Sequence, residues 1–216
     1  MSTVALLERL HWLGHDSFRL DGPPTIYFDP LNLKGSPPKA DIVLISHEHF
    51  DHCSPDDVKR ISGPGTVIVA AADAAKKLRG DVRVLRPGER ITVAGVEIEA
   101  VPAYNVNKFR SPGNPFHPKG AGHCGYVVTV GGERIYFAGD TDRIPEMADI
   151  RCDVALLPVG GTYTMTAEEA AQAAADIHPK VAVPMHWGGG VVGSREDAER
   201  FRALYAGETV IMELEQ

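Results

Sequence analysis

The chain has few cysteines, a shortage of positive charge and no long hydrophobic run. Its three cysteines, Cys53, Cys124 and Cys152, are scattered and form no CxxC pair. This argues against a secreted disulfide scaffold and against a thiolate zinc ribbon. Only 22 Lys and Arg stand against 29 Asp and Glu, which gives a formal net charge of −7. Because sequence-independent nucleic-acid binding depends on basic residues that neutralise phosphates, we expect no nucleic-acid partner.

No apolar run reaches the length of about 18 residues that a membrane-spanning helix needs. The first residues, MSTVALLERLHW, carry no cationic segment before their short apolar run and no small-residue cleavage site. We therefore expect a cytoplasmic protein that does not contact a membrane. Without internal repeats or low-complexity linkers, the 216 residues fit a single domain, 1–216, that can bury a core without a structural metal.

Short apolar or alternating runs predict strands in both halves of the chain, for example over residues 4–13, 41–45 and 209–213. Ser54, followed by proline, predicts a helix start after the strand at 41–45. A capping box at Thr166, with glutamate three residues later, predicts a second helix. Two strand-rich halves, each closed by helices, favour an α/β sandwich with the sheets inside.

Residues 105–122, NVNKFRSPGNPFHPKGAG, show no periodicity. Loops of this length in compact domains are usually functional or disordered. Tyr104, Asn105 and Lys108 open the segment and are candidates for substrate binding, although a solvated loop face explains them equally well. We expect the segment to form a binding loop.

The strongest local signal is HEHFDH, which places His47, His49, Asp51 and His52 directly after the apolar run DIVLIS. Burying such groups unpaired costs several kcal/mol each, so we expect them to face a cleft at the end of a strand. The HxH alternation puts the first two histidines on one side, and the turn into the following helix can direct the other two residues toward a second point. The motif could therefore supply ligands to two metal ions.

Three further apolar runs end in a possible ligand, at Asp29, Asp140 and His186. Each is followed by a proline, threonine or glycine turn or lies directly beside one. Scaffolds of the α/β type commonly assemble their active sites from residues at strand ends. Imidazole and carboxylate groups are therefore the expected ligands of any bound metal.

HxHxDH, followed by GDTD and PMHWG, resembles the metallo-β-lactamase superfamily. The resemblance extends from HWLGHDSF and IYFDP to PMHWG, nearly the whole chain. IYFAGDTDRIPEM and LLPVGGTYTMTAEEAA are most similar to the compact, stand-alone metal-dependent hydrolases of that superfamily, of the lactonase and phospholipase D types. The resemblance implies a four-layered αβ/βα sandwich that holds two divalent ions, most often Zn²⁺. Mn²⁺, Fe²⁺ and Ni²⁺ also suit these ligands.

The resemblance implies a role for each motif residue. Six would hold the two ions: His47 and His49 the first, Asp51 and His52 the second, Asp140 both, and His186 the second. The last ligand of the first ion is open, because many members carry a histidine just after a VPA-like strand and this chain does not. His117 and His123 are the candidates, and a similar FHPK segment in relatives favours His117. Asp29 matches an acid that orients the HxHxDH loop rather than binding metal.

Zn²⁺ lowers the pKa of bound water to about 7, so a nucleophilic hydroxide exists at neutral pH. Asp51 could accept the proton of that water, and His15, in LGHDSF, is a second catalytic candidate. We expect a hydrolase that cleaves an ester, lactone or phosphoester of a small molecule. The alternatives are a phosphodiesterase or nuclease and a catalytically silent metal-binding module. A diiron redox enzyme is disfavoured, because diiron relatives carry Glu where this chain has His49. The sequence leaves homo-oligomerisation open.

Overall fold

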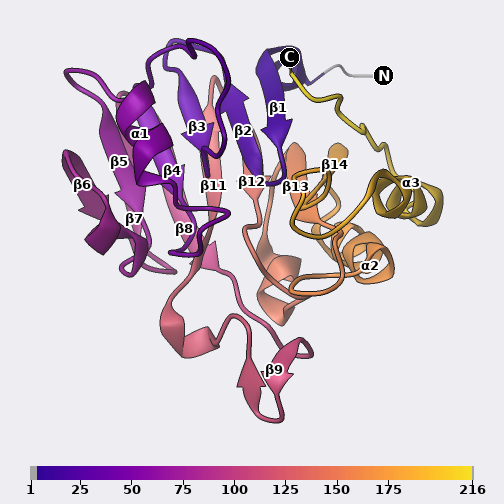
Figure 1. Ribbon diagram of the computed structural model, residues 1–216. Coiled ribbons are helices and arrows are strands. Elements are labelled where there is room, and N and C mark those ends of the chain that lie inside the picture. Colours follow the sequence, from indigo (N-terminus) through magenta and orange to yellow (C-terminus); the bar gives the residue numbers. More distant parts are fainter. Residues whose placement is uncertain (1–3, 216) are drawn as a thin grey trace.

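The computed structural model describes residues 4–215, and within that range it contains two six-stranded sheets packed face to face (Figure 1). The first sheet comprises β1 (Leu10–Gly14), β2 (Ser17–Leu20), β3 (Ile26–Phe28), β4 (Ile42–Ile45), β5 (Val67–Ala70) and β6 (Asp81–Val84), in that order. The second has the order β14 (Val181–Met185), β13 (Val154–Pro158), β12 (Glu133–Phe137), β11 (Cys124–Val130), β8 (Val96–Pro102) and β7 (Arg90–Val93).

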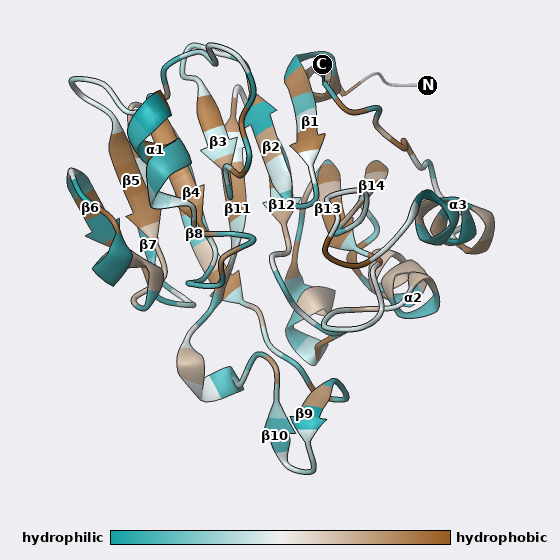
Figure 2. Ribbon diagram, in the orientation of Figure 1, coloured by the Kyte–Doolittle hydropathy of each residue, from teal (hydrophilic) through white to brown (hydrophobic). Residues whose placement is uncertain are grey.

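Helices cover the outer faces of both sheets. Helix α1 (Pro55–Ile61) lies on the first sheet, and α2 (Ala167–Ile177) and α3 (Arg195–Leu204) lie beside the second (Figure 1). Figure 2 shows apolar strands between more hydrophilic helices. The predicted α/β sandwich is confirmed. That residues 1–216 form one domain stays a prediction, and residues 1–3 and 216 lie outside the described range.

Strand β4 shows why the core has two parts. Side chains alternate between the two faces of a strand, so Ile42 and Leu44 join the core between the sheets, while Val43 and Ile45 join the core under α1. All four are fully buried. Between the sheets, the rings of Phe28 and Phe137 lie 5.4 Å apart, centre to centre. Because both faces of β4 are covered, the strand needs apolar residues at every position.

The predicted helix starts are confirmed, whereas two predicted strands form only in part, the first of them as β1 from Leu10 onward. Ser54 accepts a hydrogen bond at the start of α1, and Thr166 begins α2 with a complete capping box. Residues Ala5–Arg9 of the predicted strand 4–13 form a 3-10 helix, because the carboxylate of Glu133 accepts hydrogen bonds from two of its first backbone amides. The predicted strand at 209–213 is reduced to a single bridge between Thr209 and Ala182.

The segment 105–122 contains more structure than its composition suggests. It forms a small hairpin, β9 (Phe109–Ser111) and β10 (Asn114–Pro115), followed by a 3-10 turn at Lys119–Ala121. The hairpin projects from the body of the molecule (Figure 1). No helix within residues 4–215 combines the length and apolar character needed to cross a bilayer.

Candidate metal centre

The histidine and aspartate motifs all lie at the carboxyl ends of parallel strands. Strands β3 and β4 are parallel neighbours in one sheet, and β12, β13 and β14 are parallel neighbours in the other. The HEHFDH segment follows β4, Asp29 follows β3, Asp140 follows β12 and His186 follows β14. Asp29 and His186 have positive φ angles, of 38° and 61°, which are uncommon for residues other than glycine. The two sheets therefore present their ligand-bearing ends to one another.

A first group consists of His47, His49, His117 and Asp140, whose potential ligand atoms all lie within 4.8 Å of one another. Nδ1 of His49 lies 3.0 Å from Nε2 of His47 and 3.2 Å from Nε2 of His117. Nε2 of His117 also lies 3.2 Å from Oδ2 of Asp140. Three imidazole nitrogens and one carboxylate oxygen thus converge on one point, as a metal ion requires.

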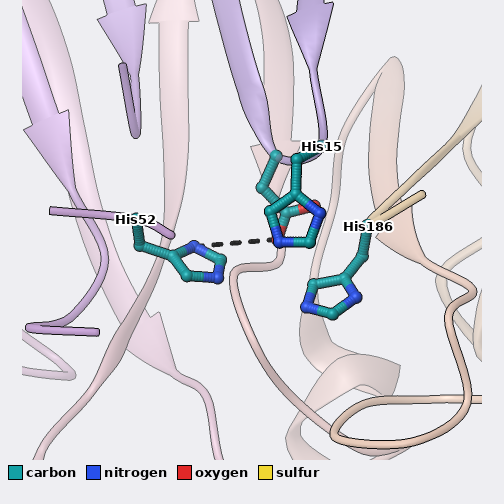
Figure 3. Close-up of side chains that lie close together, drawn as sticks. His15, His52 and His186 are labelled. Carbon is teal, nitrogen blue, oxygen red and sulfur yellow. Dashed lines mark ion pairs between the residues drawn. The ribbon is translucent and has the colours of Figure 1, made fainter. Parts of the chain in front are cut away.

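A second group surrounds the other oxygen of Asp140. Oδ1 of Asp140 lies 3.2 Å from Nε2 of His52 and 3.3 Å from Nε2 of His186. Oδ2 of Asp51 lies 3.8 Å from Nε2 of His52. Figure 3 shows the rings of His52 and His186 flanking that of His15. Asp140 therefore stands between two sets of nitrogen donors, one at each carboxylate oxygen.

Several of these atoms are buried without a hydrogen-bond partner among residues 4–215. They are Nε2 of His52, both ring nitrogens of His186 and Oδ1 of Asp140. The contacts of Asp140 with the two histidines are close but do not have hydrogen-bond geometry. Burying an unsatisfied polar group costs about 1–3 kcal/mol, more if it is charged, and a bound cation would remove that cost. The residues present therefore fit a metal-bound state, and imidazole with carboxylate suits Zn²⁺, Mn²⁺, Fe²⁺ or Ni²⁺.

The electrostatics of the first group favour the protonation states that bind metal, whereas in the second group Asp140, against the effect of burial, raises the pKa of His52 well above its ordinary value. Burial and the neighbouring His52 hold the pKa of His47 well below its ordinary value. Burial and His117 lower the pKa of His49 to about 4. Although burial opposes it, the surrounding histidines, His52 first among them, hold the pKa of Asp140 well below its usual range. Neutral imidazole and ionised carboxylate are the forms that ligate metal ions.

Asp29 fixes the orientation of His52 from behind. It is fully buried and accepts hydrogen bonds from the backbone amide of Ser46 at 2.8 Å and from the Ser46 hydroxyl. Its Oδ2 lies 2.8 Å from Nδ1 of His52, so the opposite nitrogen of that ring faces Asp140. A carboxylate that holds the far side of a ligand histidine in this way sets its tautomer and its direction.

His15 contacts Asp51, and it also clusters with Asp16, His52 and His186, whose potential ligand atoms all lie within 4.8 Å of one another and of its own. Nε2 of His15 lies 3.2 Å from Oδ2 of Asp51, and both residues are buried. Sequence reasoning missed the neighbouring Asp16, which is fully buried with neither carboxylate oxygen hydrogen-bonded within the described residues. Burial raises the pKa of Asp16 to about 8. Oδ2 of Asp16 lies 3.7 Å from Nδ1 of His52. The only sequence signal for Asp16 was its position next to His15.

The structure places the two candidate histidines differently. His117 belongs to the first group, and Asn105 holds it there: Oδ1 of Asn105 accepts from the His117 amide at 2.7 Å and lies 2.9 Å from Nδ1. His123 instead pairs with Asp73, with 3.0 Å between Nε2 and Oδ2. Its ring centre is 4.9 Å from that of His47, but its nitrogens are outside the first group. The geometry therefore favours His117 as the closing ligand.

The family model for the β-lactamase superfamily domain matches residues 9–186. The chain belongs to the metallo-β-lactamase superfamily. A UPF0173 metal-dependent hydrolase from Methanoculleus marisnigri is 39% identical over 185 residues, 83% of this chain and 80% of the relative. The chain therefore stands among the metal-dependent hydrolases of this superfamily, as the motifs predicted.

Solved structures agree with this membership. A protein named as a metal-dependent hydrolase, from Parabacteroides distasonis, is 36% identical and superposes with a TM-score of 0.80, over 95% of this chain and 93% of that one. A metallo hydrolase from Ignicoccus hospitalis, at 24% identity, shares the fold with a TM-score of 0.74 over 96% of this chain and 95% of that one.

In this metallo-β-lactamase fold, a cleft of about 340 Å³ lies over the two groups. Its lining comprises four cluster residues, His49, Asp51, His117 and Asp140, and five others, Phe50, Arg110, Phe116, Tyr163 and Val191. The predicted substrate-binding residues are elsewhere. The Tyr104 hydroxyl donates to Glu146 at 2.9 Å, and Lys108 pairs with Glu169 at 2.7 Å. Asn105 holds His117. None of the three lines the cleft, and their role in substrate binding stays a prediction.

Proposed function

We propose that this chain is a dinuclear hydrolase that cleaves an ester, lactone or phosphoester of a small molecule. The observation that carries the proposal is the position of Asp140, whose Oδ2 faces His117 and whose Oδ1 faces His52 and His186. A carboxylate with a separate set of nitrogen donors at each oxygen is suited to bridging two ions. The proposal includes Zn²⁺ as the native metal and the cytoplasm as the location.

The proposed ligand sets follow the two groups. His47, His49 and His117 would hold one ion, Asp51, His52 and His186 the other, and Asp140 both. The bound ions would supply a water of low pKa and polarise the carbonyl or phosphoryl oxygen of the substrate. The protein contributes orientation: Asp29 directs His52, and His15 holds Asp51 at the floor of the cleft, where Asp51 can accept a proton from the attacking water.

Removing the metal should abolish hydrolysis. We expect about two ions per chain in the purified protein, measured by metal-resolved mass spectrometry, because the two groups together offer seven ligands. Chelation should eliminate turnover of p-nitrophenyl acetate, a γ-lactone or bis(p-nitrophenyl) phosphate, whichever of them the protein hydrolyses, and Zn²⁺ should restore it. Turnover that survives complete chelation would contradict the proposal. A preference for the phosphodiester would favour the phosphodiesterase alternative.

The two candidate histidines should behave differently when replaced by alanine. We expect His117→Ala to weaken binding of one ion by more than about 100-fold, since losing a direct ligand should exceed the 10–100-fold cost of losing an outer partner. The matched variant His123→Ala removes an imidazole that pairs with Asp73, so the metal content should stay at the wild-type level. Competition titrations against a zinc-sensitive dye measure the Zn²⁺ affinity of both variants. The assignment is wrong if only the second variant loses metal.

A further inference from the structure

Arg110 lies on the wall of the cleft with its charged group held against an aromatic ring. Its guanidinium carbon is 5.2 Å from the centre of the Phe116 ring. That ring in turn meets the ring of Tyr163 edge-on, at 4.7 Å and 76° between planes. Stacking of this kind positions a guanidinium without occupying its N–H donors. Arg110 can therefore present a fixed set of donors to a molecule in the cleft.

Arg110 also differs from the other cations of segment 105–122. Lys108 lies 2.7 Å from a carboxylate oxygen of Glu169, and Lys119 lies 2.8 Å from one of Glu146. Within residues 4–215, Arg110 takes part in no ion pair and no side-chain hydrogen bond, although it lines the cleft above the metal cluster. A guanidinium matches a carboxylate or a phosphate with two parallel hydrogen bonds. An anion brought by the substrate would supply the missing partner.

Apart from Arg110 and the cluster residues, the lining of the cleft is mostly apolar. Phe50 is 77% exposed, which is unusual for so large an apolar side chain, and it lines the same cleft as Phe116 and Val191. Exposed aromatic side chains at a ligand site contribute contact area for an apolar or planar group. The floor, in contrast, carries the carboxylates of Asp51 and Asp140. The lining of the cleft therefore combines groups of the candidate metal cluster with apolar side chains and one cation.

We propose that Arg110 recognises an anionic group of the substrate that is remote from the scissile bond. The substrate class is an ester, lactone or phosphoester that carries a carboxylate or phosphate separated from the scissile bond by an apolar or aromatic segment. This inference rests on the proposed function, which supplies the type of scissile bond and its place at the floor. Arg110 is thus the specificity-determining residue of the cleft, and it takes no part in the chemical step.

Calorimetric titration of the metal-loaded protein with 4-phenylbutyrate, and with its neutral amide, tests this assignment without any turnover. Arg110→Gln should weaken the affinity for the carboxylate about fivefold, the upper range for a partly exposed charge pair. The affinity for the amide should not change. The control Arg202→Gln removes an exposed arginine of α3 that pairs with Glu199, and it should affect neither ligand.

Three outcomes would overturn the assignment: equal affinity of Arg110→Gln and wild type for the carboxylate, equal loss for carboxylate and amide, or no binding of the carboxylate to wild type. A kinetic comparison adds a second measurement. Arg110→Gln should lower kcat/KM for mono-p-nitrophenyl succinate more than that for p-nitrophenyl acetate. If the protein hydrolyses neither ester, the calorimetric result still reports on Arg110, and the chelation experiment with the lactone and the phosphodiester reports on the proposed function.

Discussion

Replacing Asp140 with asparagine should lower metal-dependent hydrolysis by about a thousandfold, equivalent to about 4 kcal/mol of transition-state stabilisation. Asp140 is 3% exposed and lies within 3.3 Å of nitrogens of His52, His117 and His186. An amide keeps the shape of the side chain but removes its charge and one of its two acceptor oxygens. One ion should be lost or bound much more weakly, because a neutral group cannot bridge two cations.

The measurement combines metal content with steady-state kinetics on the substrate that the chelation experiment identifies. Asp149→Asn is the matched control, since it makes the same change at an exposed carboxylate of the same sheet connection and should keep both ions and full turnover. Circular dichroism confirms that each variant is folded. If Asp140→Asn retained two ions and wild-type turnover, the bridging role assigned to Asp140 would be wrong.

Much of the candidate metal cluster could be predicted because its histidines and aspartates belong to short motifs. HEHFDH follows a strand whose burial on both faces is evident from its composition, so its polar residues had to lie beyond the strand end. The same reasoning located Asp140 and His186. The helix starts at Ser54 and Thr166 were also predictable, since a cap depends on residues within one turn.

The predictions that were wrong or left open depend on partners that lie far away in the sequence. Residues Ala5–Arg9 leave the predicted strand because their amides bond to Glu133, more than 100 positions later. The choice between His117 and His123 depends on Asn105 and Asp73, and no spacing rule connects these pairs. In the sequence, Asp16 resembles an ordinary turn residue, and only the fold shows that it is buried. The structure at such positions depends on long-range packing, which local sequence patterns do not indicate.

Asp142, two residues after Asp140, should be the main support of the loop that carries His117. Asp142 is fully buried and accepts hydrogen bonds from the backbone amides of Val106 and Asn107, at 2.7 and 2.8 Å. It also accepts one from Nδ2 of Asn105 at 3.1 Å. Each donor left without an acceptor costs about 1–3 kcal/mol. We therefore expect Asp142→Ala to lower the free energy of unfolding of the metal-free protein by about 3–5 kcal/mol, measured by urea denaturation.

A control in helix α2 separates this effect from a general loss of negative charge. Asp176 pairs with Arg143 on the surface, so Asp176→Ala should change the free energy of unfolding by less than about 1 kcal/mol. Equal unfolding midpoints for the two variants would contradict the role assigned to Asp142.

The same contacts predict how activity should fail in the Asp142→Ala variant. Because Asn105 bonds to both Asp142 and His117, loosening this loop should weaken one metal site while leaving the ligands themselves unchanged. Turnover should therefore be low at limiting Zn²⁺ and recover substantially at high Zn²⁺. Asp140→Asn should show no such recovery, since the bridging group itself is missing. The zinc dependence thus distinguishes a residue that positions a ligand from a residue that binds the metal.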